Sequence, residues 1–189
     1  MTEIVLFHHI QGLTSGVHAF ADRLRAAGHT VHTPDSFEGR TFASIDEGEA
    51  YCSEVGFQAV RDRGIATAED LSADVVYGGF SLGVMAAQTL TQTKPGARAL
   101  LAYHGFADPS YFGTWPDGTP VQIHAMDADP FFVGEGDIDA AHELVEAADD
   151  AELFLYPGDT HMLVEFDANP DDPNFRAVTD RVLEFLQRV

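Results

Sequence analysis

The feature that most constrains the fold is the stretch from Val75 to Met85, where an apolar run leads into Gly79-x-Ser81-x-Gly83. A segment of helix-forming composition follows at once. Between a strand and a helix, this pattern is typical of a nucleophile elbow, in which the serine lies at the tip of a tight turn beyond the strand's carboxyl end. Taken alone, it also fits an ordinary turn, because glycine and serine are common in turns. Residues later in the chain favour the first interpretation.

Short apolar runs alternate with helical patterns along the chain. The predicted strands cover residues 3–8, 30–33, 75–77, 99–103, 121–125 and 152–156. The predicted helices cover residues 15–27, 45–63, 82–93 and 137–148, and a last helix begins near residue 172. This alternation predicts about six mostly parallel strands with helices on both faces, a three-layer α/β sandwich. No linker or repeat divides residues 1–189, so we expect a single domain.

Polar residues follow three of the predicted strands directly. Ser81 follows the third strand, Asp127 and Asp129 follow the fifth, and His161 follows the sixth. Sites in open parallel sheets lie beyond the carboxyl ends of the strands, so these residues should meet. A serine hydroxyl becomes a good nucleophile when an imidazole accepts its proton, and an acid must orient that imidazole. The order Ser, Asp, His is also the one that the α/β-hydrolase arrangement uses.

Such a site also needs backbone donors for the oxyanion that forms when a carbonyl is attacked. We expect one donor to be the N–H of Leu82, the residue after Ser81. The other should come from the turn after the first strand, from Ile10 or Gln11. Gly12 would let the backbone approach closely at this turn.

These motifs together resemble the dienelactone hydrolase family of α/β-hydrolases, in particular its short members. The resemblance is carried by His8–Val17, Gly79–Val84, Tyr103–Gly105, Asp127–Phe131 and Tyr156–His161. It implies an α/β-hydrolase fold, hydrolysis of an ester or lactone, and no cofactor. It puts the acid on Asp129, with Met126 where the family usually has glycine, and Asp127 stays open as the alternative.

The chain departs from the family's namesake at two places. The namesake uses a cysteine nucleophile, where this chain has Ser81, and it has an acidic residue where His9 stands here. The lone Cys52 falls in a predicted helix, and we expect it to be a structural or surface thiol. These departures favour a general ester, lactone or thioester hydrolase over hydrolysis of the dienelactone itself.

The charge of the chain limits its partners and its location. Thirty-one acidic residues face 10 Lys and Arg, which gives a net charge of −21. This charge argues against binding to nucleic acid or to an anionic membrane surface. No apolar run approaches the ~18–20 residues of a membrane span, and the N-terminus does not resemble a signal peptide. With one cysteine no internal disulfide can form, so we expect a cytoplasmic protein, either a monomer or a homodimer.

Other side chains near the strand ends have roles that the sequence leaves open. Four histidines could gather at the mouth of the site: His8, His9, His104 and His124. Aromatic and sulfur-containing side chains either line a pocket or anchor loops there: Phe37, Phe42, Trp115, Phe131, Phe132 and Met162. We expect no metal site, because no H-x-x-x-H or H-E-x-x-H spacing is present.

The sequence thus predicts a small serine hydrolase that acts on a small apolar ester, thioester or lactone. Ser81 attacks, His161 transfers protons, Asp129 orients His161, and no cofactor is needed. The alternative is a non-catalytic hydrolase-like protein that binds a small molecule or a metal. A flavodoxin-like binding protein fits poorly, because the turn at residues 8–12 has one glycine and lacks a Ser/Thr-rich phosphate loop.

Overall fold

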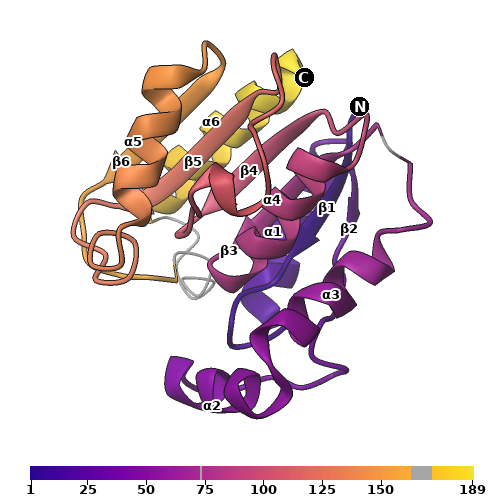
Figure 1. Cartoon of the computed structure of the whole chain (residues 1–189), viewed down its shortest axis with the longest axis vertical. Helices are drawn as coiled ribbons and strands as arrows, with labels where there is room; N and C mark the ends of the chain where they lie inside the picture. Colours follow the sequence, from indigo (N-terminus) through magenta and orange to yellow (C-terminus); the bar gives the residue numbers. More distant parts are fainter. Residues whose placement is uncertain (73, 163–171) are drawn as a thin grey trace.

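The computed structural model describes residues 1–72, 74–162 and 172–189. Its centre is a six-stranded sheet in which every strand pairs in parallel, in the order β2-β1-β3-β4-β5-β6 (Figure 1). The strands are β1 (Glu3–Phe7), β2 (Thr30–His32), β3 (Val76–Phe80), β4 (Ala99–Tyr103), β5 (Val121–Met126) and β6 (Ala151–Tyr156). All six predicted strands are present, so the predicted α/β fold is confirmed.

Helices connect the strands and begin where the sequence offers capping side chains. They are α1 (Ser15–Ala26), α2 (Ile45–Val55), α3 (Phe57–Thr67), α4 (Leu82–Thr93), α5 (Asp137–Ala147) and α6 (Pro173–Arg188), with a short 3₁₀ helix at Pro109–Tyr111. The side chains of Ser44 and Asp172 accept backbone N–H groups at the starts of α2 and α6. Within the described ranges, no helix is long and apolar enough to cross a membrane.

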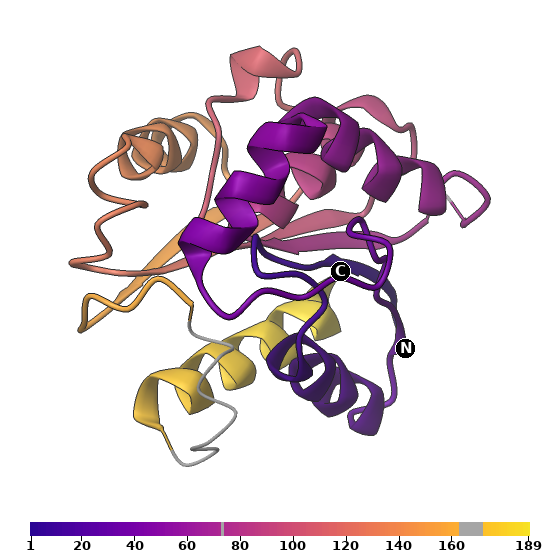
Figure 2. The same ribbon diagram turned by 90° about the horizontal axis from the view of Figure 1, so that it is seen from below.

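The helices cover both faces of the sheet, as Figure 2 shows from below. Helices α1 and α6 pack on one face, and α3, α4 and α5 pack on the other. Successive residues of β1 alternate between these layers: Ile4 and Leu6 face α1 and α6, whereas Val5 and Phe7 face the opposite layer. Because both faces are buried, the central strands β1, β3 and β4 are almost continuously apolar.

The helix predicted over residues 45–63 is wrong in one respect, since it is two helices that meet at Gly56. Gly56 has φ 99°, a left-handed conformation that glycine adopts without a steric penalty, and its N–H donates to the Cys52 carbonyl at 2.8 Å. The turn lets α2 leave the helical layer and lie beside the loop after β1. The third strand also runs further than predicted, because Gly78 and Gly79 continue the ladder with β1.

Candidate active site

Ser81 lies in a strained turn between β3 and α4. Its φ of 47° is rare for a residue with a side chain, and its N–H donates to the Tyr103 carbonyl at 2.7 Å. The motif glycines let the chain pass this closely. A Cβ on Gly79 would overlap the backbone of Gly83, and a Cβ on Gly83 would lie 2.6 Å from the His8 carbonyl oxygen. The local sequence therefore produces a turn that lifts the serine above the sheet.

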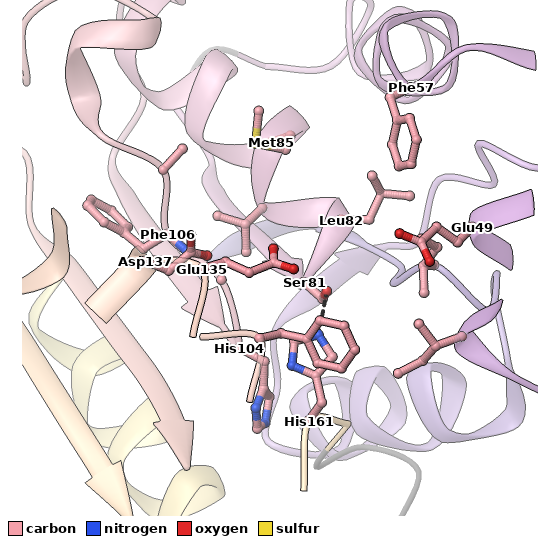
Figure 3. A pocket seen from close by; sticks show the side chains of 16 residues that line it. Glu49, Phe57, Ser81, Leu82, Met85, His104, Phe106, Glu135, Asp137 and His161 are labelled. Carbon is pink, nitrogen blue, oxygen red and sulfur yellow. Dashed lines mark hydrogen bonds between the residues drawn. The ribbon is translucent and has the colours of Figure 1, made fainter. Parts of the chain in front are cut away.

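Ser81, His161 and Asp129 are hydrogen-bonded in series. The Ser81 Oγ lies 2.8 Å from Nε2 of His161 (Figure 3). On the other side of the ring, Nδ1 of His161 lies 2.8 Å from Oδ2 and 3.0 Å from Oδ1 of Asp129. A carboxylate only accepts hydrogen bonds, so Nδ1 carries the proton and Nε2 is left as the acceptor for the serine hydroxyl. The imidazole therefore has the tautomer that a general base needs.

The two aspartates after β5 have different partners. Asp129 is fully buried and contacts His161, whereas the Asp127 carboxylate accepts the Gly158 N–H at 3.0 Å. Asp127 thus holds the turn after β6, and Asp129 is the aspartate that reaches the imidazole.

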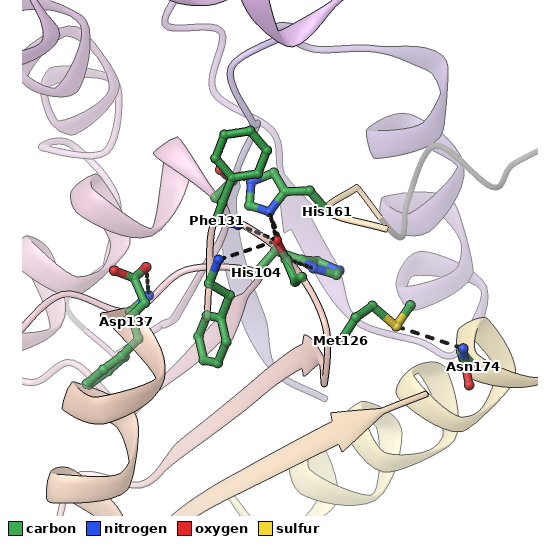
Figure 4. Close-up of polar contacts among 10 residues, drawn as sticks. His104, Met126, Phe131, Asp137, His161 and Asn174 are labelled. Carbon is green, nitrogen blue, oxygen red and sulfur yellow. Dashed lines mark hydrogen bonds and ion pairs between the residues drawn. The ribbon is translucent and has the colours of Figure 1, made fainter. Parts of the chain in front are cut away.

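The Asp129 carboxylate also accepts hydrogen bonds from groups other than His161. Its Oδ1 accepts the N–H groups of Phe131 at 3.0 Å and Phe132 at 3.3 Å, and its Oδ2 lies 3.1 Å from Nδ1 of His104 (Figure 4). Burial alone would raise the pKa of Asp129, but the hydrogen bonds from His104 and His161 hold it well below its ordinary value. The acid is therefore ionised at neutral pH.

The predicted oxyanion donors lie beside Ser81. Leu82 is the first residue of α4, so its N–H has no partner within the helix. Ile10 lines the same cavity as Leu82 and Ser81. The N–H of Gln11 already donates to Nδ1 of His9 at 3.2 Å, which makes Ile10 the better placed of the two candidates. Gly12 has φ 96°, and a Cβ there would overlap the Arg40 carbonyl oxygen.

A cavity of about 250 Å³ opens next to Ser81 and His161. Apolar side chains form much of its wall: Ile10, Ile45, Phe57, Leu82, Val84, Met85, Phe106 and Phe131. Three carboxylates also line it, Glu49 from α2, Glu135 from the loop before α5 and Asp137 from the start of α5 (Figure 3). Burial raises the pKa of Asp137, although the bond that it accepts from the Phe106 N–H opposes this effect. Among the described lining residues, none is lysine or arginine.

The four histidines of open role do not all reach the cavity. Of them, His104 lines the cavity, and the other three are hydrogen-bonded within the fold. His8 lies 2.7 Å from the His9 carbonyl and accepts the Ser36 N–H at 3.0 Å, and His124 contacts Tyr156 and Gln122 at 2.8 Å each. His8 and His9 therefore shape the turn that carries Ile10. Sequence reasoning did not separate His104 from the rest, although it alone directly follows a central strand and precedes glycine.

The aromatic residues and the methionine whose roles the sequence left open fall into two groups, one lining the cavity and the other packed in the core. Phe131 lines the cavity, and its ring packs on His161 with the ring centres 4.5 Å apart. Phe37, Phe42 and Met162 belong to an apolar cluster around α2 and α3. Phe132 and Trp115 pack on the core beneath α4 and α5. The buried Cys52 lies in the α2 cluster, and burial raises the pKa of its thiol to about 11, so it is a structural residue rather than a nucleophile.

A metal ion would have one possible set of ligands in the described part of the chain. Ligand atoms of His104, Asp129 and His161 all lie within 4.8 Å of one another. The hydrogen bonds among these three side chains already satisfy the same atoms. The arrangement is therefore explained without a metal.

Comparisons with known proteins bear on the family and the fold of the chain. The model of the dienelactone hydrolase family matches residues 1–189. A solved structure from Xanthomonas campestris, described as a hydrolase of the α/β superfamily, is 21% identical with a TM-score of 0.69, and each chain is covered completely. One from Klebsiella pneumoniae, described as a dienelactone hydrolase, is 15% identical with a TM-score of 0.74, over 100% of this chain and 88% of that one.

A dienelactone hydrolase from Anabaena variabilis is 17% identical with a TM-score of 0.67, over 99% of this chain and 86% of that one. At these identities the likeness to solved structures shows the fold alone. No curated protein sequence matches the chain significantly.

Proposed function

The chain belongs to the dienelactone hydrolase family of ester-cleaving α/β-hydrolases, and from this premise we propose that it is a serine hydrolase of small esters, lactones or thioesters. The observation that carries the proposal is the series of hydrogen bonds from Ser81 through His161 to the buried Asp129. In a reaction of this kind, His161 takes the proton of the Ser81 hydroxyl as the oxygen attacks the carbonyl carbon.

The remaining steps use the same side chains. The N–H groups of Leu82 and Ile10 stabilise the oxyanion, and each such donor typically contributes about 10²–10³ in rate. His161 then gives its proton to the leaving alcohol or thiol as an acyl-enzyme forms. Water hydrolyses this ester with His161 again acting as the base. Asp129 keeps the ring in the required tautomer and stabilises its charge.

The cavity supports a small substrate without negative charge. A volume of about 250 Å³ is below the ~300–1,000 Å³ of sites for drug-sized ligands. The carboxylates of Glu49, Glu135 and Asp137 would repel an anionic acyl or alcohol group, and the net charge of −21 adds to that repulsion. An apolar, neutral ester or one with a cationic group fits both the walls and the charge.

Covalent labelling of the purified protein with a fluorophosphonate, followed by intact mass, tests the function. We expect one adduct on the wild type, none on Ser81→Ala, and much slower labelling of His161→Ala. Ser110→Ala and Cys52→Ala are the controls, because these residues lie outside the site, and both should label like the wild type. A well-folded wild type that does not label would contradict the proposal and favour a binding protein.

A further inference from the structure

A second histidine contacts the Asp129 carboxylate and has no part in the series from Ser81 to Asp129. His104 follows β4 directly, and its Nδ1 lies 3.1 Å from Oδ2 of Asp129. His161 reaches the same oxygen from the loop after β6 at 2.8 Å. The two imidazole rings meet edge to face with their centres 5.7 Å apart (Figure 4). One buried carboxylate is therefore shared by two histidines.

The backbone at His104 is held in an unusual conformation. Its φ is 55°, a left-handed conformation that is strained for a residue with a side chain. Its N–H donates to the His124 carbonyl at 2.8 Å, and the next residue, Gly105, passes so close to Ser81 that a Cβ would lie 3.2 Å from the Ser81 carbonyl oxygen. Such strain persists where the surroundings fix it, and here it aims the imidazole at the carboxylate.

The contact between His104 and Asp129 determines which ring nitrogen of His104 carries a proton. Asp129 is an ionised acceptor, so Nδ1 of His104 must be the donor. Burial lowers the pKa of His104, although the bond to Asp129 opposes this effect, and the nearby His161 and His9 lower it further. Asp137, at the start of α5, is a further charged group that interacts with Asp129 and His161. A neutral His104 can donate to the carboxylate without neutralising its charge.

We propose that His104 is a positioning residue, a neutral imidazole whose Nδ1–H holds Oδ2 of Asp129 so that the carboxylate faces His161 in its ionised form. The inference rests on the proposed function, because it gives His104 a role in orienting the general base. It also explains why two oxygens with about four acceptor sites meet two backbone N–H groups and two imidazoles. Without His104, Oδ2 of a fully buried carboxylate would keep His161 as a donor but lose the second one.

Steady-state kinetics on an activated ester across a pH range test this role. In His104→Phe the ring is kept but the donor is lost, so we expect kcat to fall about 10- to 100-fold with little change in KM. The carboxylate would also become more basic toward His161, and the acid limb of the kcat/KM profile should move to higher pH. His104→Asn keeps an N–H near the position of Nδ1 and tolerates a positive φ, so it should restore most of the rate and the profile.

A matched control is His124→Phe, which removes an equally buried histidine that does not touch Asp129. Its kcat and its acid limb should match the wild type. The proposal is overturned if His104→Phe keeps the wild-type rate and profile, or if the Phe and Asn variants lose activity equally. Fluorophosphonate labelling tests the proposed function and the role of His104 separately. An unlabelled wild type refutes the hydrolase. Normal labelling of the wild type and of His124→Phe with slowed labelling of His104→Phe supports the positioning role.

If His104→Phe does not fold, the wild type itself provides a test. Nitrogen-resolved NMR of the histidine rings at pH 7 should give His104 as the neutral Nδ1–H tautomer. An Nε2–H tautomer or an imidazolium would contradict the proposal.

Discussion

His104 and His124 are neighbours with similar surroundings but different partners. Both are buried, and the backbone N–H of His104 donates to the carbonyl of His124 at 2.8 Å. His104 lies one residue beyond β4 and faces the Asp129 carboxylate. His124 lies within β5 and contacts two neutral groups, the Tyr156 hydroxyl and the Gln122 amide.

The difference shows that position along a strand decides what a buried histidine can do. Within β5, aromatic side chains stack on the His124 ring, and burial lowers its pKa to about 3. A ring that stays neutral among neutral partners holds the core together. Beyond the end of β4, the chain turns, and the His104 ring both contacts a charged carboxylate and lines a cavity. The carboxylate and the cavity, rather than burial, distinguish the two regions.

Removing the Asp129 carboxylate should leave His104, like His124, with uncharged partners only, and we expect the largest loss of activity from this change. In Asp129→Asn the acceptor for His104 and His161 becomes an amide, so the imidazole of His161 loses its required tautomer and we expect kcat to fall about 10⁴-fold. Asp127→Asn is the matched control, because its carboxylate accepts the Gly158 N–H and does not touch His161. Ester hydrolysis with initial-rate kinetics measures both. Comparable losses in the two variants would contradict the assignment of Asp129.

Removing the ring that faces neutral partners should affect stability alone. His124→Phe keeps the aromatic stack with Tyr103 but removes the ring nitrogens that contact the Tyr156 hydroxyl and the side-chain oxygen of Gln122. We expect the free energy of unfolding to fall by about 1–3 kcal/mol. Urea denaturation followed by circular dichroism measures this loss. A variant as stable as the wild type would mean that these bonds contribute nothing.

Most of the fold and of the candidate site could be predicted from the sequence, and the features that could not have a common cause. The strands and the order Ser81, Asp129, His161 follow from local patterns: apolar runs, turn glycines and polar residues after strands. The break at Gly56 was missed because a helical pattern continues on both sides of it. The contact between His104 and Asp129 was missed because it joins residues 25 positions apart in the sequence. Local spacing predicts elements, whereas packing decides which of several similar side chains meet.

Lowering the pH should destabilise the wild type through His124, the buried histidine with neutral hydrogen-bond partners. The pKa of His124 is about 3 in the fold and about 6.5 when exposed, so the unfolded chain binds more protons between these values. Stability therefore rises with pH across that window and is lost on acidification, by about 2 kcal/mol at pH 5 through this ring alone. Arg181 and His104 also lower this pKa, and neither changes the sign.

The measurement is the urea midpoint from pH 7.5 to pH 5 for the wild type and His124→Phe. Because falling pH also relieves repulsion among the 31 acidic residues, the informative quantity is the difference between the two slopes. The wild type should lose stability more steeply. Parallel slopes would show that His124 does not titrate on unfolding in this range.

The charge of the substrate should have the smallest effect, and it probes the cavity that His104 and His161 line. Consider three p-nitrophenyl esters of equal acyl length that end in a methyl, a trimethylammonium or a carboxylate group, each normalised to its rate of alkaline hydrolysis. Glu49, Glu135 and Asp137 line the cavity, so kcat/KM for the anionic ester should be about 10-fold below that for the neutral one at low salt.

Salt and substitution separate this local field from intrinsic reactivity. The difference between the esters should shrink as the Debye length falls to about 8 Å at 0.15 M salt. Glu135→Gln should narrow it, whereas Glu143→Gln, an exposed residue of α5 outside the cavity wall, should leave most of it in place. Equal rates for the anionic and neutral esters at low salt would mean that the lining carboxylates do not face the bound acyl group. The cavity would then select its substrate by shape and uncharged contacts, which are also the contacts that surround His124 in the core.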